Sequence, residues 1–367
     1  MKYFSSFFTT LICFICCSNA QNGTVSGINK DGVQLEYNVF GKVQKLCSYK
    51  GGFLDGWFAE FDENGKLKKE GLYKNGVISG VGYEYENDAI KRKITWIQTD
   101  SANKIYSEIV YDTYSGFKRS EGIWKNNLKD SIWIHYDEKE KVRALERFSV
   151  GKRKGFQEKY YPNGNLAEKT FLLNGVFSGN RILLTENGDT TEFGNYIDGK
   201  KNGIFTLCEP LRIKDLFQDE RSYKIIANYI NGKLNGNVII RYLSGKVAVS
   251  EFYENDRLTG NRKLYFENGN VSSFCNYLNG IKNGDEKFYY DNGQLKTESR
   301  YLNGSLEGYQ IYYFENGAIS ERFTFQSGDL LMTESFYPNK IIRERKKFKS
   351  GKINTSESFS PDGKRLK

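Results

Sequence analysis

The chain has 367 residues, among them 37 glycines, 26 tyrosines, 26 phenylalanines, four prolines and one histidine. Abundant glycine beside many aromatic residues is typical of a turn-rich β protein. Outside the first twenty residues the cysteines are Cys47, Cys208 and Cys275, and none of them lies in a CxxC or Cys/His cluster. This argues against a zinc site, and we expect no metal or cofactor. The formal net charge of +9 is concentrated near the C-terminus, where residues 340–367 carry ten basic and three acidic side chains.

The first twenty residues predict a secretory signal peptide, cleaved between Ala20 and Gln21. Their apolar run, Phe4 to Cys17, is about 14 residues long, and a membrane-spanning helix needs roughly 20. We therefore expect an exported protein that is periplasmic, outer-membrane-associated or secreted, with no transmembrane segment. The alternative is a lipid anchor on Cys16 or Cys17, although the bulky Ile15 fits lipoprotein processing poorly.

A repeat of about 24 residues follows, with an aromatic residue at its first position. The clearest series of these aromatic residues is Tyr229, Tyr253, Tyr277, Tyr301 and Phe325. The repeats divide the mature chain into a degenerate first unit (21–48), repeats over 49–206 that are irregular at 97–123, an insertion (207–228) and regular repeats with a basic end (229–367).

Two Asn-Gly pairs recur in each repeat, at positions 3–4 and 16–17, as in Asn279-Gly280 and Asn292-Gly293. Asn-Gly between alternating apolar segments is the strongest short-range signal for a β-hairpin, because both residues tolerate positive φ. Each repeat is therefore predicted to hold two strands and two reversals. The expected fold is all-β: an elongated antiparallel hairpin array.

Positions 12 and 14 are predicted to face the core in the first strand, as in Phe288 with Tyr290. In the second strand, positions 19, 21, 23 and 1 share a face. Cys47 and Cys275 both fall at position 23, so they are predicted to be small buried hydrophobic residues rather than reactive thiols. Cys208 has no clear assignment.

The tyrosines at position 13 point to the face opposite that core, and they are Tyr160, Tyr265, Tyr289 and Tyr313. Such a row could stack against sugar rings or an extended peptide. The alternative is that these rings lie across a solvent-facing sheet and make cross-strand contacts, and the energetics favour it.

The insertion offers a second candidate binding surface. Its sequence from Glu209-Pro210 to Leu216 and Phe217 predicts one short amphipathic helix near 209–220, with proline in the first turn. Segments inserted into a regular array often form its distinctive face, so Leu216 and Phe217 are candidate contact residues.

The string aromatic-x-Asn-Gly-x-x-x-Gly, followed by Tyr-Tyr-x-Asn-Gly, resembles the variant MORN repeat of bacterial proteins often labelled YwqK-family antitoxins. The match is best over Tyr229 to Phe325 and weak between Trp96 and Trp124. The resemblance implies antiparallel hairpin arrays and a role in binding or tethering, and it brings no catalytic residues. The antitoxin label implies a cytosolic protein, which the signal peptide contradicts.

No catalytic site is expected. His135 is flanked by Tyr136, Asp137 and Glu138, but neighbours along a strand point to opposite faces. The leading hypothesis is a monomeric binding or scaffold module for a protein, an envelope polysaccharide or another anionic surface, and not for nucleic acid. The alternatives are a secreted neutraliser of a partner protein and, third, a carbohydrate-active enzyme.

Overall fold

The computed structural model describes residues 31–100, 103–211 and 221–366; between 209 and 222 it describes the backbone of the paired strands but not their side chains. The chain divides into two compact units, Met1–Gly116 (unit 1) and Phe117–Lys367 (unit 2). Both consist of antiparallel strands, and the described residues contain no helix. The prediction of an all-β hairpin array is confirmed.

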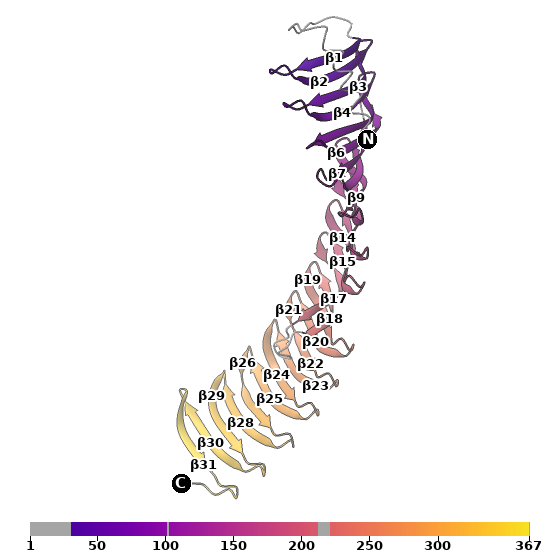
Figure 1. Ribbon diagram of the computed structural model, residues 1–367. Coiled ribbons are helices and arrows are strands. Elements are labelled where there is room, and N and C mark those ends of the chain that lie inside the picture. Colours follow the sequence, from indigo (N-terminus) through magenta and orange to yellow (C-terminus); the bar gives the residue numbers. More distant parts are fainter. Residues whose placement is uncertain (1–30, 101–102, 212–220, 367) are drawn as a thin grey trace. The chain divides into compact units, whose positions relative to one another are not determined.

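The strands of unit 1 are β1 (Gly32–Tyr37), β2 (Val43–Lys50), β3 (Phe53–Phe61), β4 (Leu67–Lys74), β5 (Val77–Glu86), β6 (Ala89–Thr99) and β7 (Lys104–Tyr111). Those of unit 2 begin with β8 (Lys118–Lys125), β9 (Leu128–Tyr136), β10 (Val142–Ser149), β11 (Lys152–Arg153), β12 (Gly155–Tyr160), β13 (Leu166–Leu173), β14 (Val176–Leu184), β15 (Thr190–Ile197), β16 (Lys200–Lys201), β17 (Gly203–Leu211) and β18 (Arg221–Ile230). They continue with β19 (Lys233–Arg241), β20 (Val247–Glu254), β21 (Arg257–Leu258), β22 (Gly260–Tyr265), β23 (Val271–Leu278), β24 (Ile281–Tyr289), β25 (Leu295–Leu302), β26 (Ser305–Leu306), β27 (Gly308–Tyr313), β28 (Ile319–Gln326), β29 (Asp329–Phe336), β30 (Ile342–Lys349) and β31 (Lys352–Ser358). Figure 1 shows the last of these strands side by side in chain order.

The two Asn-Gly pairs of a repeat form different turns. Asn279 and Gly280 have φ values of 53° and 85°, as a two-residue type I′ hairpin requires. In the five-residue turn between β24 and β25, Gly293 has positive φ but Asn292 does not. There the Asn292 side chain instead accepts a hydrogen bond from the backbone N–H of Gln294 at 2.9 Å. Only the glycine of the second pair therefore needs the left-handed region.

Replacing Gly304 with valine is expected to lower the stability of its hairpin by about 1–3 kcal/mol. Gly304 has φ of 86°, and a Cβ there would lie 3.1 Å from Cγ2 of Ile281 in the preceding repeat. The control replaces Ser305, the next residue and the first of β26, with valine. This change should alter stability little, because valine suits a strand. Thermal melting compares the two variants, and equal melting temperatures would contradict the turn assignment.

Neighbouring repeats are joined by hydrogen bonds at both ends of their strands. At the two-residue turns, the glycine N–H donates to a carbonyl of the preceding repeat, as from Gly280 to Leu258 at 2.7 Å. At the five-residue turns, a tyrosine hydroxyl donates to a carbonyl of the next repeat, as from Tyr242 to Tyr265 at 2.6 Å. These contacts stack the turns in register along each unit.

Strands in each unit pair mainly with their neighbours in sequence. A side chain is therefore covered chiefly by its row neighbours, the residues paired opposite it on the two adjacent strands. Leu264, at position 12, lies beside Val249 and is 3% exposed. Phe288, at the same position one repeat later, lies between Ser273 and Thr297 and is 40% exposed. The prediction that position 12 faces the core holds for Leu264 but is wrong for Phe288, because the small side chains of Ser273 and Thr297 on the adjacent strands leave its ring open.

Cys47 and Cys275 are buried, at 4% and 7% exposure, as predicted for position 23. Both are free thiols. Burial is the main cause that raises the pKa of the Cys275 thiol to about 11, and burial also raises the pKa of Cys47. Thiols that stay protonated at neutral pH are poor nucleophiles, which supports a packing role.

The predicted helix in the insertion does not begin at Glu209. Residues Glu209–Leu211 belong to β17, whose pairing with β18 continues to Leu211 opposite Arg221. The continued backbone ladder between these strands outweighs the local helical pattern, since strand pairing satisfies the same N–H and C=O groups. Leu216 and Phe217 lie outside the described residues.

Candidate functional site

The tyrosines at position 13 lie half-buried on the sheet, and two of the four predicted candidates are bonded to carboxylates. The hydroxyl of Tyr313 donates to Glu298 at 2.6 Å, and that of Tyr160 donates to Glu158 at 2.9 Å. Burial, followed by the carboxylate, raises the pKa of Tyr313 to about 12 and also raises that of Tyr160. The Tyr313 contact joins two strands and the Tyr160 contact lies within β12, and both hydroxyls are held by carboxylates rather than presented for a ligand.

Tyr265 and Tyr289 differ from Tyr313 because the preceding repeat offers no carboxylate at the position that Glu298 occupies. The residue three before the leading aromatic is Glu298 in one repeat, but Ser250 and Phe274 in the two that precede Tyr265 and Tyr289. Tyr85 with Glu70 and Tyr136 with Glu121 repeat the tyrosine–carboxylate pairing elsewhere. The glutamate at this position was the signal in the sequence for the cross-strand pairs, whereas Tyr160 pairs with Glu158 of its own strand.

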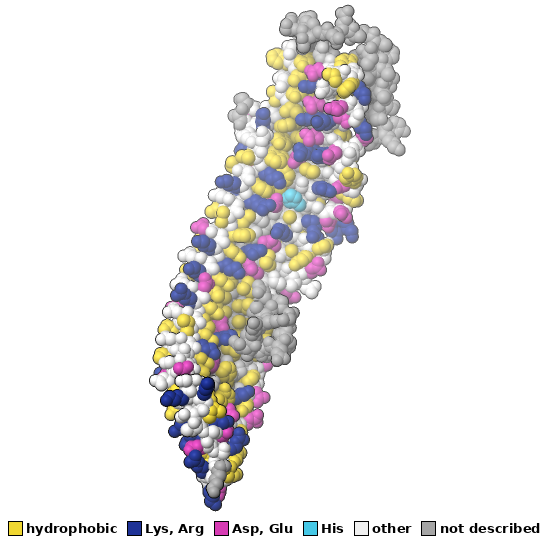
Figure 2. All heavy atoms as spheres, turned by 90° about the vertical axis from the view of Figure 1, so that its left-hand side faces the viewer, with side chains coloured by type: hydrophobic (Ala, Val, Ile, Leu, Met, Phe, Trp, Pro, Cys, Tyr) yellow, Lys and Arg dark blue, Asp and Glu magenta, His cyan; other side chains and the backbone are white. Residues whose placement is uncertain are grey.

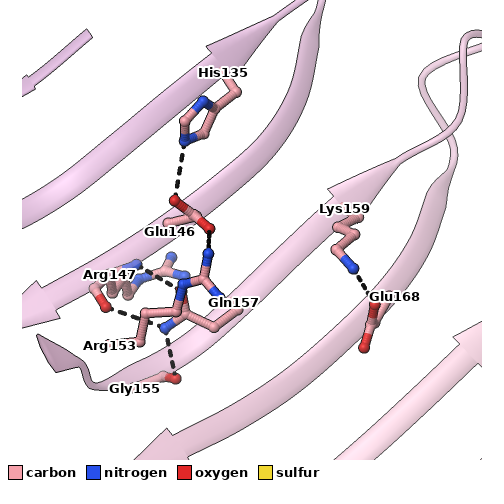
Figure 3. Close-up of polar contacts among 8 residues, drawn as sticks. All are labelled: His135, Glu146, Arg147, Arg153, Gly155, Gln157, Lys159 and Glu168. Atoms are coloured by element: carbon pink, nitrogen blue, oxygen red, sulfur yellow. Dashed lines mark hydrogen bonds and ion pairs between the residues drawn. The ribbon is translucent and has the colours of Figure 1, made fainter. Parts of the chain in front are cut away.

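His135 lies on β9 and belongs to a cross-strand charge network on the opposite face of the sheet (Figure 3). Its Nε2 lies 3.0 Å from Oε2 of Glu146, whose other oxygen accepts a hydrogen bond from Arg153. Its sequence neighbour Tyr136 bonds instead to Glu121. Asp137 lies in the turn after β9, where its Oδ1 accepts hydrogen bonds from the backbone N–H groups of Lys139 and Lys141 at 2.9 Å, so it does not pair with the imidazole.

The same face carries further carboxylates that are each held by cations. Glu168 accepts from Lys159 at 2.8 Å and from Arg181 at 3.1 Å, and Arg181 also reaches Glu192 at 3.1 Å. Burial alone would raise the pKa of Glu168, but the hydrogen bond from Lys159 and the charges of Lys159 and Arg181 hold it below its usual range. Figure 2 shows charged side chains of both signs interleaved with hydrophobic ones. This network neutralises its own charges and stabilises the sheet.

An open site in unit 1 is a groove beside two successive two-residue turns, with a volume of about 680 Å³. Apolar side chains on its wall are open to solvent: Phe53 is 63% exposed and Leu72 is 43% exposed. Exposed Lys50 and Lys74, one repeat apart, lie at its rim. The groove was not predicted from the sequence. The feature that could have indicated it is Phe53, an aromatic residue directly after the Gly51-Gly52 turn.

Asp55, on the wall of this groove, is already engaged. Its Oδ2 accepts a hydrogen bond from the backbone N–H of Asn75 at 3.1 Å, which fixes one turn against the other. The groove therefore has a rigid floor, apolar walls and a basic rim. Such a surface suits binding rather than bond-making chemistry.

The family model described as "MORN repeat variant" matches residues 54–75, 155–174, 258–279 and 282–303. These four segments are similar to the MORN repeat variant, and all of them lie within the array of hairpins. No curated protein matches the chain.

The solved structures that match the chain are far longer, and the chain spans only 20–25% of their length. One is the crystal structure of TcdB2-TccC3 without its hypervariable C-terminal region, at 12% identity and a TM-score of 0.17, covering 90% of this chain and 20% of that one. Another is the Photorhabdus luminescens Tc holotoxin pore with the TccC3-D651A mutation, at 12% identity and a TM-score of 0.15, covering 91% of this chain and 25% of that one. Likenesses this weak support no functional conclusion.

Among the described residues, no helix is long and apolar enough to cross a membrane.

Proposed function

We propose that this protein is an exported, non-catalytic module that binds a partner protein and acts as a scaffold. The observation that carries the proposal is the groove in unit 1, where Phe53 and Leu72 stay exposed between Lys50 and Lys74. Elsewhere the ionisable groups examined as candidate sites are paired, as in the networks around His135 and Glu168. Open apolar side chains on a preorganised framework favour protein recognition.

Site-specific crosslinking tests the binding role. A photo-reactive phenylalanine analogue at position 53 is expected to capture one protein in the native cells. The same analogue at Phe193, which is 45% exposed on β15, is the control and should capture little. Equal yields at both positions, or none at position 53, would overturn the proposal.

Export rests on the pattern of the first twenty residues, since the short apolar run ends in small residues before Gln21. Mass spectrometry of the protein from the periplasmic and extracellular fractions is expected to show an N-terminus at Gln21 without lipid. A lipidated cysteine at position 16 or 17, or an intact Met1, would contradict this prediction.

A second candidate function, which the exposed groove beside Phe53 would also serve, is a secreted neutraliser that blocks a partner protein. A tight one-to-one complex that abolishes the captured protein's activity would support it over a scaffold. Turnover of an envelope polysaccharide by the purified protein would instead support the carbohydrate-active alternative.

A further inference from the structure

Five consecutive two-residue turns of unit 2, with the residues that flank them, form a surface that we call the turn ridge. Its segments are 125–129, 149–153, 173–177, 197–201 and 230–234. The turns are joined by four hydrogen bonds from a turn glycine to the preceding repeat: Gly151 to Lys129, Gly175 to Arg153, Gly199 to Phe177 and Gly232 to Lys201, at 2.8–2.9 Å. The ridge is therefore a rigid row of turns about 9–10 Å apart, two strand spacings for each repeat.

Aliphatic side chains along the ridge are half-open to solvent. They are Leu128 (43% exposed), Val150 (69%), Leu173 (44%), Val176 (47%), Ile197 (50%) and Ile230 (48%). Some also pack onto the next turn: a Cβ on Gly199 would lie 3.3 Å from Cγ1 of Val176. Consecutive exposed aliphatic residues held in this way form a continuous apolar line, which is a mark of an interaction surface.

The ridge is also strongly basic. Its five segments contain seven lysine or arginine side chains against one aspartate, Asp198. Three of the cations are engaged within the sheet, as Arg153 is with Glu146. The other four, Lys125, Lys152, Lys200 and Lys233, are exposed and form no ion pair with the described residues. The available charge therefore lies beside the exposed aliphatic side chains.

We propose that the turn ridge binds an acidic polypeptide segment that also carries aliphatic side chains; the inference rests on the proposed binding function and specifies the chemistry of the partner. Lysines spaced one repeat apart attract carboxylates, and the aliphatic line between them buries apolar side chains. The exposed hydrophobic residues of the ridge include no aromatic ring on which sugars or bases could stack. Trp and Phe, which anchor interfacial elements in lipid, are also absent from that exposed set.

A peptide-binding experiment on the full mature chain tests this assignment. The probe is a short fluorescein-labelled peptide that combines glutamate with leucine, and binding is followed by fluorescence anisotropy at low and moderate salt. The double variant K152E/K200E is expected to weaken binding at least about tenfold, because each substitution replaces an attraction with a repulsion. The double variant L173S/I197S is expected to weaken it as well.

The matched control is K139E/K141E, which makes the same change in net charge on exposed lysines of a five-residue turn in unit 2. It should change binding less than about twofold. Circular dichroism melting verifies that all variants remain folded. Equal losses for ridge and control variants, or equally tight binding of polyglutamate, would show that charge alone acts and would overturn the proposal.

Vesicles of phosphatidylglycerol serve as a competitor that distinguishes an anionic membrane from an acidic polypeptide as the partner. The proposal of a polypeptide is wrong, and the partner is a membrane, if the vesicles displace the peptide and if the ridge variants, but not the control variant, lose binding to the vesicles. The crosslinking experiment at position 53 can be repeated in a protein that also carries K152E/K200E. If the partner is still captured in full, the ridge assignment fails while the proposed function stands. Absence of any captured partner would count against the proposed function instead.

Discussion

Replacing Phe205 with alanine is expected to lower the free energy of unfolding of unit 2 by about 3–5 kcal/mol. Phe205 is fully buried on β17. Its ring lies 5.3 Å from that of Tyr196 and 5.2 Å from that of Tyr229, both in edge-to-face geometry. It also lies so close to Gly194 that a Cβ there would be 2.3 Å from the ring. Alanine would leave a cavity that these neighbours cannot close without moving strands.

Chemical denaturation measures the loss, and amide hydrogen exchange of β15 to β19 should locate it, because repeats depend mainly on their neighbours. Phe193 is the matched control: it is the same residue type, lies on the adjacent strand β15 and is 45% exposed. Its replacement with alanine should cost about 1 kcal/mol or less. Comparable losses for the two variants would show that Phe205 is not a packing centre.

Replacing Glu334 with glutamine is expected to destabilise the C-terminal repeats by about 3 kcal/mol at neutral pH. The Glu334 side chain is 1% exposed and joins two strands on either side of β29. It accepts hydrogen bonds from Nε of Arg322 at 2.7 Å and from Nε of Arg345 at 2.8 Å. Glutamine keeps the shape but removes the charge, so both guanidinium groups lose their ion pair and one of them faces an amide NH2 group in place of an acceptor.

The pH dependence of stability gives this prediction a second readout. Burial alone would raise the pKa of Glu334, but hydrogen bonds from Arg322 and Arg345 hold it below its ordinary value of 4.5. A lowered pKa means that the stabilisation is complete above about pH 4.5 and is lost as the pH falls through the folded-state pKa. The wild-type protein should therefore lose stability more steeply than E334Q in that acidic range.

Glu357 is the control for Glu334, because it is 28% exposed, lies 4.0 Å from Arg345 and otherwise pairs at 3.3 Å with the exposed Arg365. Its replacement with glutamine should cost less than about 1 kcal/mol and leave the acid slope nearly unchanged. If E334Q and E357Q behave alike, the buried carboxylate does not hold the strands together as the geometry indicates.

Much of the fold could be predicted because turns are encoded locally. Asn279-Gly280 specifies its type I′ turn by itself, since both residues tolerate positive φ whatever surrounds them. The strand period then places Cys47 and Cys275 on a buried face. The candidate sites were less predictable: the pairing of Tyr313 with Glu298 depends on which residue the preceding strand places opposite.

The amino-acid sequence by itself determined the repeat, the two reversals in each repeat and the alternation of faces, because these depend on residues within one hairpin. Only the tertiary structure decided that Phe288 is exposed, that Glu209–Leu211 extend a strand, and that the groove beside Phe53 is open. Each of these depends on the neighbouring strands, whose residues come from other parts of the chain. In a sheet covered mainly by its own row neighbours, burial is a property of the register rather than of the residue.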